Sequence, residues 1–148
     1  MRMKVGLAFA VAGVLIAGMA VGQDDPIATR QALMKRNGEE AKTAFFMVKG
    51  KTPFDATAAT DAMNSLAADM EILPTLFPPG SETGGNTRAS PDAFTNLDDL
   101  KALASKLGTD AKAAAAAAAQ GPEAFATAFN AIDADCSACH EKYRIRQQ

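Results

Sequence analysis

Five consecutive residues near the C-terminus carry the side chains of this chain that are best suited to chemistry: Cys136, Ser137, Ala138, Cys139 and His140. They include both cysteines and the only histidine of the sequence. Residues three and four positions apart share one face of a helix, so the two thiols and the imidazole project to the same side. Two thiols at this spacing can add to the two vinyl groups of a haem, and neutral imidazole is a good iron ligand. The pattern C-x-x-C-H therefore predicts a covalently attached c-type haem, with Cys136 and Cys139 as thioether sites and His140 as an axial ligand.

Three other roles are open to a cysteine pair at this spacing. A thioredoxin-like redox pair lies at a helix start in a βαβ context, whereas this pair lies near the end of a helical stretch. A zinc site requires four ligands, and the cluster offers three. A disulfide across two intervening residues of a helix has strained geometry. A thiol oxidoreductase stays open as a hypothesis of a different class, which a titration of free thiols in the mature protein tests.

The N-terminus has the layout of a secretory signal peptide. A short basic start with Arg2 and Lys4 precedes an apolar run, residues 5–21, which ends in small residues before an acidic stretch. We expect cleavage after Gly22, which removes residues 1–22 and leaves residues 23–148 as a single domain. The apolar run is of borderline length for a membrane anchor, but its small-residue end favours cleavage, and no membrane attachment is expected afterwards.

The charge and the motifs of the mature chain exclude several classes of function. The formal net charge is −2 for the whole chain and becomes −4 when Arg2 and Lys4 are removed. Because no basic stripe remains, nucleic acid is not an expected partner. The sequence carries no acid/base pair, nucleophile elbow or phosphate-binding loop, so we do not expect an enzyme.

Four amphipathic helices must position the cysteine–histidine cluster. Start and stop residues place them at about 26–49, from 55 or 57 to 74, from 96 or 97 to 120, and from 122 onward. Short first and third connections make neighbours antiparallel, which predicts an all-α, up-down-up-down four-helix bundle. The apolar stripes that would face the core are Ile27, Met34, Ala41, Phe45 and Val48; Ala59, Met63, Leu66, Met70 and Leu73; Leu97, Leu100, Leu103 or Ala104, Leu107 and Ala111; and Phe125, Phe129, Ile132, Cys136, Cys139 and Tyr143.

The connection between the second and third long helices is the one long irregular segment, residues 74–95. Its prolines and glycines exclude regular structure over most of its length, with a short turn of helix expected at Ser90-Pro91. Loops of this length in a compact domain are usually functional or disordered. Phe77 and Phe94 indicate that this loop packs onto the bundle.

The bundle topology predicts what surrounds the histidine. At ~1.5 Å per residue, Met34 lies ~12 Å from the start of the first helix and His140 ~9 Å from the end of the fourth, at the same end of the bundle. If these helices are neighbours, Met34 lies across a haem from His140. Arg30 and Arg144 then flank the mouth, where the arginine fork suits the haem carboxylates, unless both are merely solvated arginines at helix ends. The expected apolar lining is Met70, Leu73, Leu97 and Leu100.

The landmarks together are similar to those of a known family. They are the signal peptide, Arg30-Gln31, residues 48–55 at the first turn, Leu73-Pro74 with Phe77-Pro78-Pro79-Gly80, and residues 136–144. Over essentially the whole mature chain, this order resembles the class II c-type cytochromes, the cytochrome c prime family. The resemblance implies a four-helix bundle with one haem c, often a homodimer, in the periplasm of a Gram-negative bacterium. It also implies that Arg30, with Gln31 beside it, lies near a haem propionate, and that Arg144 lies beside the histidine face.

The family divides at the position of Met34. Many members leave the iron five-coordinate, crowd its distal side with a bulky apolar residue and bind nitric oxide or carbon monoxide. Another branch ligates the iron with a methionine and carries electrons. Residues 33–38 are more similar to the second branch, and Arg30-Gln31 to the first. The two hypotheses are therefore an electron carrier that serves periplasmic redox partner proteins, with His140/Met34 ligation, and a binder of small diatomic gases, with Met34 as a steric plug.

A homodimer surface is the last expectation from the sequence. Ala44, Phe45 and Met47 of the first helix offer apolar surface for a second copy of the chain, although the same residues suit the core equally well.

Overall fold

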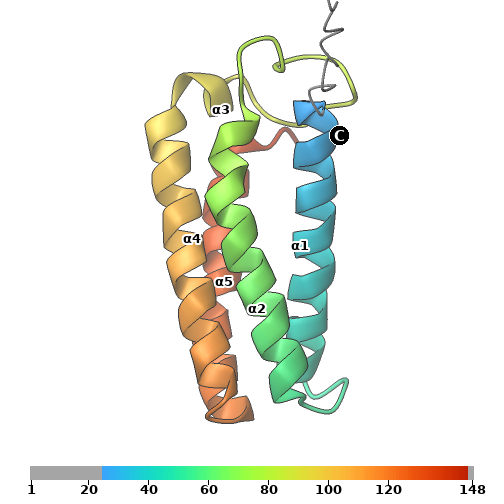
Figure 1. Cartoon of the computed structure of the whole chain (residues 1–148), viewed down its shortest axis with the longest axis vertical. Helices are drawn as coiled ribbons and strands as arrows, with labels where there is room; N and C mark the ends of the chain where they lie inside the picture. Colours follow the sequence, from blue (N-terminus) through green and yellow to red (C-terminus); the bar gives the residue numbers. More distant parts are fainter. Residues whose placement is uncertain (1–24, 147–148) are drawn as a thin grey trace, which may run out of the picture.

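The computed structural model describes residues 25–146, and the expected signal peptide, residues 1–22, lies outside the described residues. Four long helices make up the bundle: α1 (Pro26–Val48), α2 (Ala56–Ile72), α4 (Leu97–Ala118) and α5 (Pro122–Tyr143). Two short helices, η1 (Leu73–Leu76) and α3 (Asp92–Thr95), flank the long loop between α2 and α4. The long helices alternate in direction (Figure 1), which confirms the predicted all-α, up-down-up-down four-helix bundle. None of the helices in this described part is long and apolar enough to cross a membrane.

The helices begin where local chemistry predicts. The Asp25 side chain accepts a 2.9 Å hydrogen bond from the Ile27 N–H, and Asp55 caps α2 by accepting a 3.0 Å bond from the Ala58 N–H. Between α4 and α5 the chain turns at Gly121, whose φ of 112° lies in the region that favours glycine. These caps and turns give each long helix the length that carries it from one end of the bundle to the other.

The core lies mainly between α2, α4 and α5. The predicted stripe of α2 is buried in full, from Ala59 to Leu73. The stripe of α4 is buried at Leu100, Ala104, Leu107 and Ala111, whereas Leu97 and Leu103 are half-buried. On α5 the buried members are Phe125, Phe129, Ile132 and Tyr143, and the two cysteines are half-buried. The helix periodicity thus identifies the core face of these three helices.

The predicted stripe of α1 is only partly correct as a core face, with Met34 and Val48 packing against the core from partly buried positions. Of its five members only Ile27 is buried, and Phe45 is 39% exposed. The residues that pack in the core are instead Leu33, Ala44 and Met47, so two of the three that offered a dimer surface belong to the core. The physical reason is that α1 has two apolar sides. One packs in the core, and the other lines a cavity through Met34, Ala41 and Phe45.

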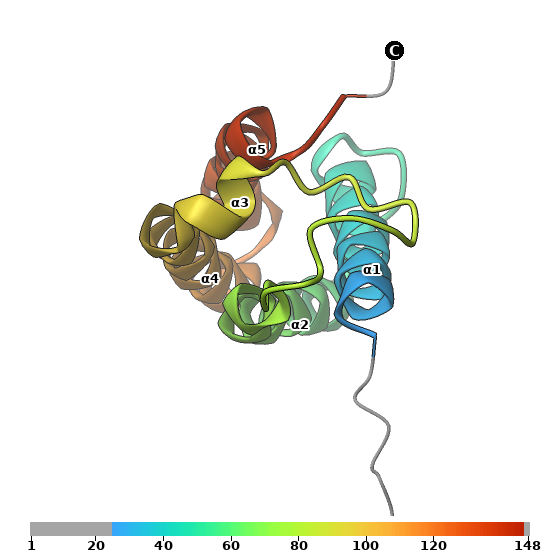
Figure 2. The same cartoon turned by 90° about the horizontal axis from the view of Figure 1, so that it is seen from above.

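The long loop covers one end of the bundle. The helix α2 ends at Ile72, next to the expected stop at Pro74, and a 3₁₀ helix with Pro74 in its first turn follows it. Residues 77–91 then cross the end where α1 begins and α5 finishes (Figures 1 and 2). The Ser90 N–H donates to the Tyr143 carbonyl at 2.9 Å, and the Ile145 N–H donates to the Arg88 carbonyl at 2.8 Å. The loop is therefore tied to the end of the helix that carries the cysteine–histidine cluster.

Candidate haem site

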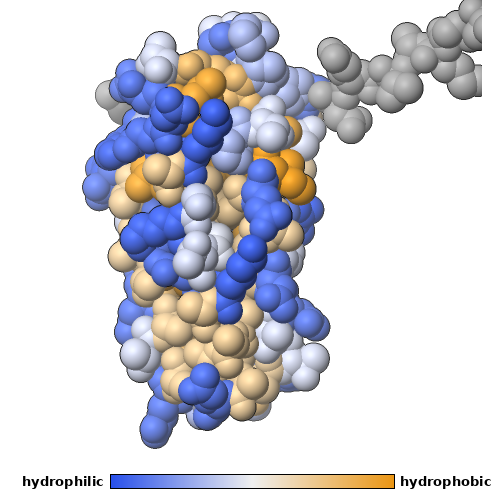
Figure 3. All heavy atoms as spheres, turned by 60° about the vertical axis from the view of Figure 1, so that its left-hand side comes forward, coloured by the Kyte–Doolittle hydropathy of each residue, from blue (hydrophilic) through white to orange (hydrophobic). Residues whose placement is uncertain are grey.

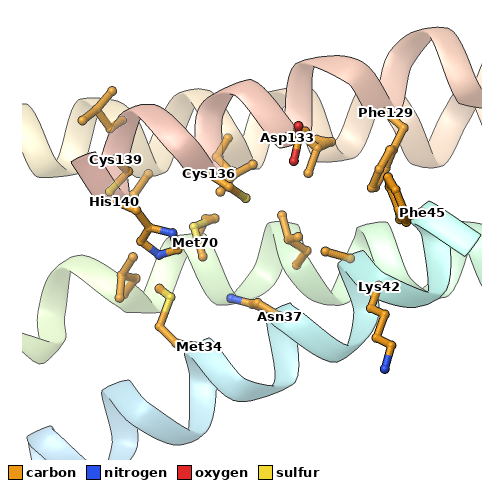
Figure 4. Close-up of a pocket in the computed structure, with 18 of the residues that line it drawn as sticks. Met34, Asn37, Lys42, Phe45, Met70, Phe129, Asp133, Cys136, Cys139 and His140 are labelled. Atoms are coloured by element: carbon orange, nitrogen blue, oxygen red, sulfur yellow. The ribbon is translucent and has the colours of Figure 1, made fainter. Parts of the chain in front are cut away.

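The last two turns of α5 place Cys136, Cys139 and His140 on one side of the helix. All three line the same cavity, which lies between α5 and the other long helices (Figure 4). Both cysteines are free thiols and both are half-buried, as is His140. The spacing thus has the structural result that the sequence predicts: two thiols and one imidazole face a common space.

That space consists of two adjoining cavities of about 500 Å³ each, within the size range of cofactor pockets. The two share Met34, Gly38, Leu73, Cys139 and His140. The deeper cavity is lined mostly by apolar side chains, among them Leu66, Met70, Leu103, Leu107, Phe129 and Ile132. The outer cavity opens toward the loop and includes Leu73 and Leu100. Of the expected lining residues, Leu97 lines neither cavity, because it is the first residue of α4 and lies beyond their end.

Met34 lies on the wall opposite His140. Figure 4 shows its thioether on α1 and the His140 ring on α5 pointing toward one another across the space. Both residues line both cavities, so they lie where the two cavities meet. Met70 of α2 also enters the deeper cavity, beside this pair.

Three arginines line the outer cavity: Arg30 from α1, Arg88 from the loop and Arg144 from the end of α5. Within residues 25–146, no acidic side chain lines this cavity. Sequence reasoning did not identify Arg88, which lies in the segment without periodicity and reaches the site because its guanidinium donates to the Ile145 carbonyl at 3.2–3.3 Å. The mouth is consequently a positive end on an otherwise apolar space, which suits a ligand with carboxylates at one edge.

Arg30 is buried, with 5% of its surface exposed, and its guanidinium holds the loop. Nη1 donates to the Leu76 carbonyl at 2.5 Å and to the Ser81 hydroxyl at 2.8 Å, while Nη2 donates to the Ser81 carbonyl at 2.7 Å and to the Thr87 hydroxyl at 3.3 Å. The guanidinium also lies 4.8 Å from the centre of the Phe77 ring and 5.3 Å from that of Phe94. A contact with a haem propionate stays a prediction for this residue.

Gln31 and Arg144 lie on either side of the mouth. The Gln31 amide donates to the carbonyls of Gly85 and Asn86 at 2.8 and 3.2 Å, so it too contacts the loop. The Arg144 side chain is exposed, and its backbone pairs with that of Ala89 in a single antiparallel β-bridge. Both residues line the outer cavity, and neither side chain is enclosed by the protein.

The titration behaviour of the cluster follows from burial. Burial lowers the pKa of His140, and the charges of Arg144 and Arg88 lower it further, which favours the neutral imidazole that an iron ligand requires. Burial raises the pKa of the Cys136 thiol to about 11 and also raises the pKa of Cys139. Thiol oxidoreductases instead depend on a lowered cysteine pKa. The environment therefore disfavours the thiol-exchange alternative.

Asn37 is a second residue of the site that sequence reasoning did not identify. It lies on α1 one turn after Met34, lines the deeper cavity and is 8% exposed. In the sequence it is one of residues 33–38, whose similarity to the electron-carrying branch does not indicate a buried amide. Its burial depends on the neighbouring helices, which a local pattern cannot show.

The residues present fit a covalent haem. Two free thiols and an imidazole whose lowered pKa favours the neutral form face one apolar space from the same helix, as thioether attachment and axial ligation require. The three arginines lie together at one end, where two propionates would leave the macrocycle.

Comparisons with known proteins identify the family of the chain. The family model described as Cytochrome C' matches residues 25–144. Cytochrome c-556 from Agrobacterium fabrum is 37% identical over 147 residues, covering 99% of each chain. The structure of cytochrome c' from Rhodopseudomonas palustris has a TM-score of 0.80 and 31% identity, covering 85% of this chain and 100% of that one.

A second similar structure is the nitric oxide complex of a mutant of cytochrome c prime from Alcaligenes xylosoxidans. Its TM-score is 0.73 at 25% identity, and the match covers 82% of this chain and 95% of that one. The family model and the close relative each span most of the described bundle. The chain therefore belongs to the cytochrome c' family, whose proteins carry one covalent haem c with its iron.

Proposed function

We propose that this chain is a periplasmic monohaem cytochrome that transfers electrons. Cys136 and Cys139 hold the haem, His140 is one axial ligand and Met34 is the other. The observation that carries the proposal is the position of Met34, whose thioether points toward His140 from the opposite wall of the cavity (Figure 4). Two strong-field ligands keep the iron's coordination constant between oxidation states, which favours fast electron transfer, and methionine ligation raises the potential.

The outer cavity supports the same proposal. Arg30, Arg88 and Arg144 supply positive charge at the edge where electrons would leave the site, and we assign Arg30, Gln31 and Arg144 to the haem propionates. Partner proteins would be periplasmic redox proteins that approach this end. No residue constellation at the site suggests an enzyme, and the role proposed is that of a carrier.

A second candidate function is the binding of nitric oxide or carbon monoxide. It is favoured by the similar structure that is a nitric oxide complex. In this alternative the iron is five-coordinate and Met34 blocks the distal side without ligating. The two candidates predict different ferric proteins, because only the first has a sulfur–iron bond.

The visible spectrum of the purified ferric protein separates them. We expect low-spin signals with a methionine–iron charge-transfer band, and their loss in Met34→Ala. Met63→Leu is the matched control, because Met63 is fully buried on α2 but lines neither cavity. A high-spin, five-coordinate spectrum in the native protein, or an unchanged spectrum in Met34→Ala, contradicts ligation by Met34.

A further inference from the structure

Asn37 is a polar side chain without a partner inside the deeper cavity. Only 8% of the residue is exposed, and neither its Nδ2 nor its Oδ1 has a hydrogen-bond partner among the described residues. Leaving a buried amide unpaired costs free energy, and native structures keep few such groups. The unpaired amide indicates that the cavity receives a molecule with which Asn37 forms a hydrogen bond.

The surroundings limit what that molecule can be. Most side chains that line the deeper cavity are apolar, and the charged residues among them, Lys42 and Asp133, are exposed. The haem propionates are not the partner, because the arginines that suit them line the outer cavity and Asn37 does not. A small polar ligand on the distal side of the haem is the remaining candidate.

The position of Asn37 relative to Met34 locates the contact. Asn37 lies three positions after Met34, a rise of about 4.5 Å along the axis, and this spacing leaves both residues on the same side of α1. Figure 4 shows both side chains directed into the space that His140 faces. The Asn37 amide consequently lies beside the sixth position of the iron, one turn deeper in the bundle than the thioether.

We propose that Asn37 is a distal hydrogen-bond donor, whose carboxamide N–H donates to a diatomic ligand held at the sixth position of the haem iron. The inference rests on the haem site: in the native protein it requires either the five-coordinate iron of the second candidate function or displacement of the Met34 thioether by the ligand. Because neither amide atom has a hydrogen-bond partner among residues 25–146, the group can rotate to present Nδ2 without breaking another hydrogen bond. A donor at this point stabilises the negative charge on the outer atom of the ligand and slows its release.

Carbon monoxide bound to the ferrous holoprotein tests the proposal. All variants are made in the Met34→Ala background, which opens the sixth position whether or not Met34 ligates. Asn37→Leu keeps the size of the side chain and removes the donor, so we expect roughly tenfold faster release of carbon monoxide and a higher C–O stretching frequency. Asn37→Gln retains an amide and should restore part of both effects. Asn64→Leu, on the exposed side of α2, is the control and should change neither.

Two results overturn the inference. One is a release rate and a C–O stretch in Asn37→Leu that equal those of the background. The other is a thermal midpoint of the ligand-free ferric Asn37→Leu protein well below that of its background, together with an unchanged stretch, which indicates a purely structural role. We expect instead that this midpoint is unchanged or higher, because the substitution removes an unpaired buried amide. The ferric spectrum of the native protein reports on Met34 separately, so failure of either proposal is recognisable.

Discussion

The α2–α4 side and the α1–α5 side of the bundle are built from different residues. Between α2 and α4 the helices approach closely at a glycine. A Cβ added at Gly108 of α4 would lie 3.4 Å from the Cβ of Met70 and 3.6 Å from the carbonyl oxygen of Ala67. Between α1 and α5 the facing residues include Met34, Asn37, Cys136 and His140, and a cavity separates them.

The difference also runs along the bundle. Near the α4–α5 turn, rings fill the interior, and Phe125 lies with its centroid 5.7 Å from that of Phe54 and 5.8 Å from that of Phe129. On the face shown in Figure 3, apolar surface predominates toward this lower end, while hydrophilic side chains cover more of the upper part. At the opposite end the interior holds the cavity, and a loop with buried polar contacts covers it. One part of the molecule maintains the fold, which allows the other to keep space for a haem.

The largest effect is expected for Phe125→Ala, at the end of the bundle near the α4–α5 turn, where rings fill the interior. Phe125 is fully buried and lines neither cavity. Removing its ring should lower the free energy of unfolding by about 3–5 kcal/mol and leave the haem spectrum unchanged. Urea unfolding and the visible spectrum measure the two effects, with Ile72→Ala, at a 47% exposed position that lines neither cavity, as the control for an exposed apolar residue. A changed spectrum would show that the two parts are not independent.

A smaller effect is expected where the loop meets the site. Arg30→Met removes the donors to the carbonyls of Leu76 and Ser81, and we expect a loss of about 2–3 kcal/mol of stability. The loop should then be cleaved faster by a protease under native conditions, because its buried contacts are gone. Arg146→Met, at an exposed position near the end of α5, is the matched control. Equal proteolysis of the two variants would contradict the role of Arg30 in holding the loop.

The helix starts, the core stripe of α2 and the attachment motif of α5 could be predicted from the sequence. Asp25 and Asp55 accept hydrogen bonds from N–H groups two and three residues away, and Pro122 fixes its own backbone angle, so the positions of these helix starts need no knowledge of the tertiary structure. The stripe of α2 was also identified, because that helix has one apolar side and the core covers it. Covalent attachment through residues 136–140 could be inferred because its chemistry depends on spacing within one helix.

The α1–α5 side was harder to predict, because its residues depend on what fills the cavity. A helical period detects an apolar side but does not distinguish packing against a helix from lining a cofactor space, which is why Met34 was expected in the core stripe and Leu33 was not. Arg88 and Thr87 reach the site through a loop without periodicity. Asn37 was not identified because a lone polar residue in a helix is usually exposed.

The smallest of these effects is expected at Tyr143, where the end of α5 meets the start of α4. Its hydroxyl donates to Asp99 Oδ2 at 2.5 Å, and Lys142 Nζ lies 3.1 Å from the same oxygen. Burial, together with the hydrogen bond to Asp99, raises the pKa of Tyr143 to about 12. Because the folded pKa is raised above the ordinary value of 10.0, this contribution to stability is complete below pH 10 and is lost as the pH rises toward 12.

Tyr143→Phe should therefore lower the free energy of unfolding by about 1 kcal/mol at pH 8, and the difference from the native protein should shrink above pH 10. Tyr143 is the only tyrosine of the chain and there is no tryptophan, so an alkaline absorbance titration reports its ionisation directly. If the hydroxyl titrates near pH 10 in the folded protein, the hydrogen bond to Asp99 does not stabilise its protonated form. The end of α5 is then held in place by backbone hydrogen bonds with the loop, one of which the Tyr143 carbonyl accepts, and not by the Tyr143 side chain.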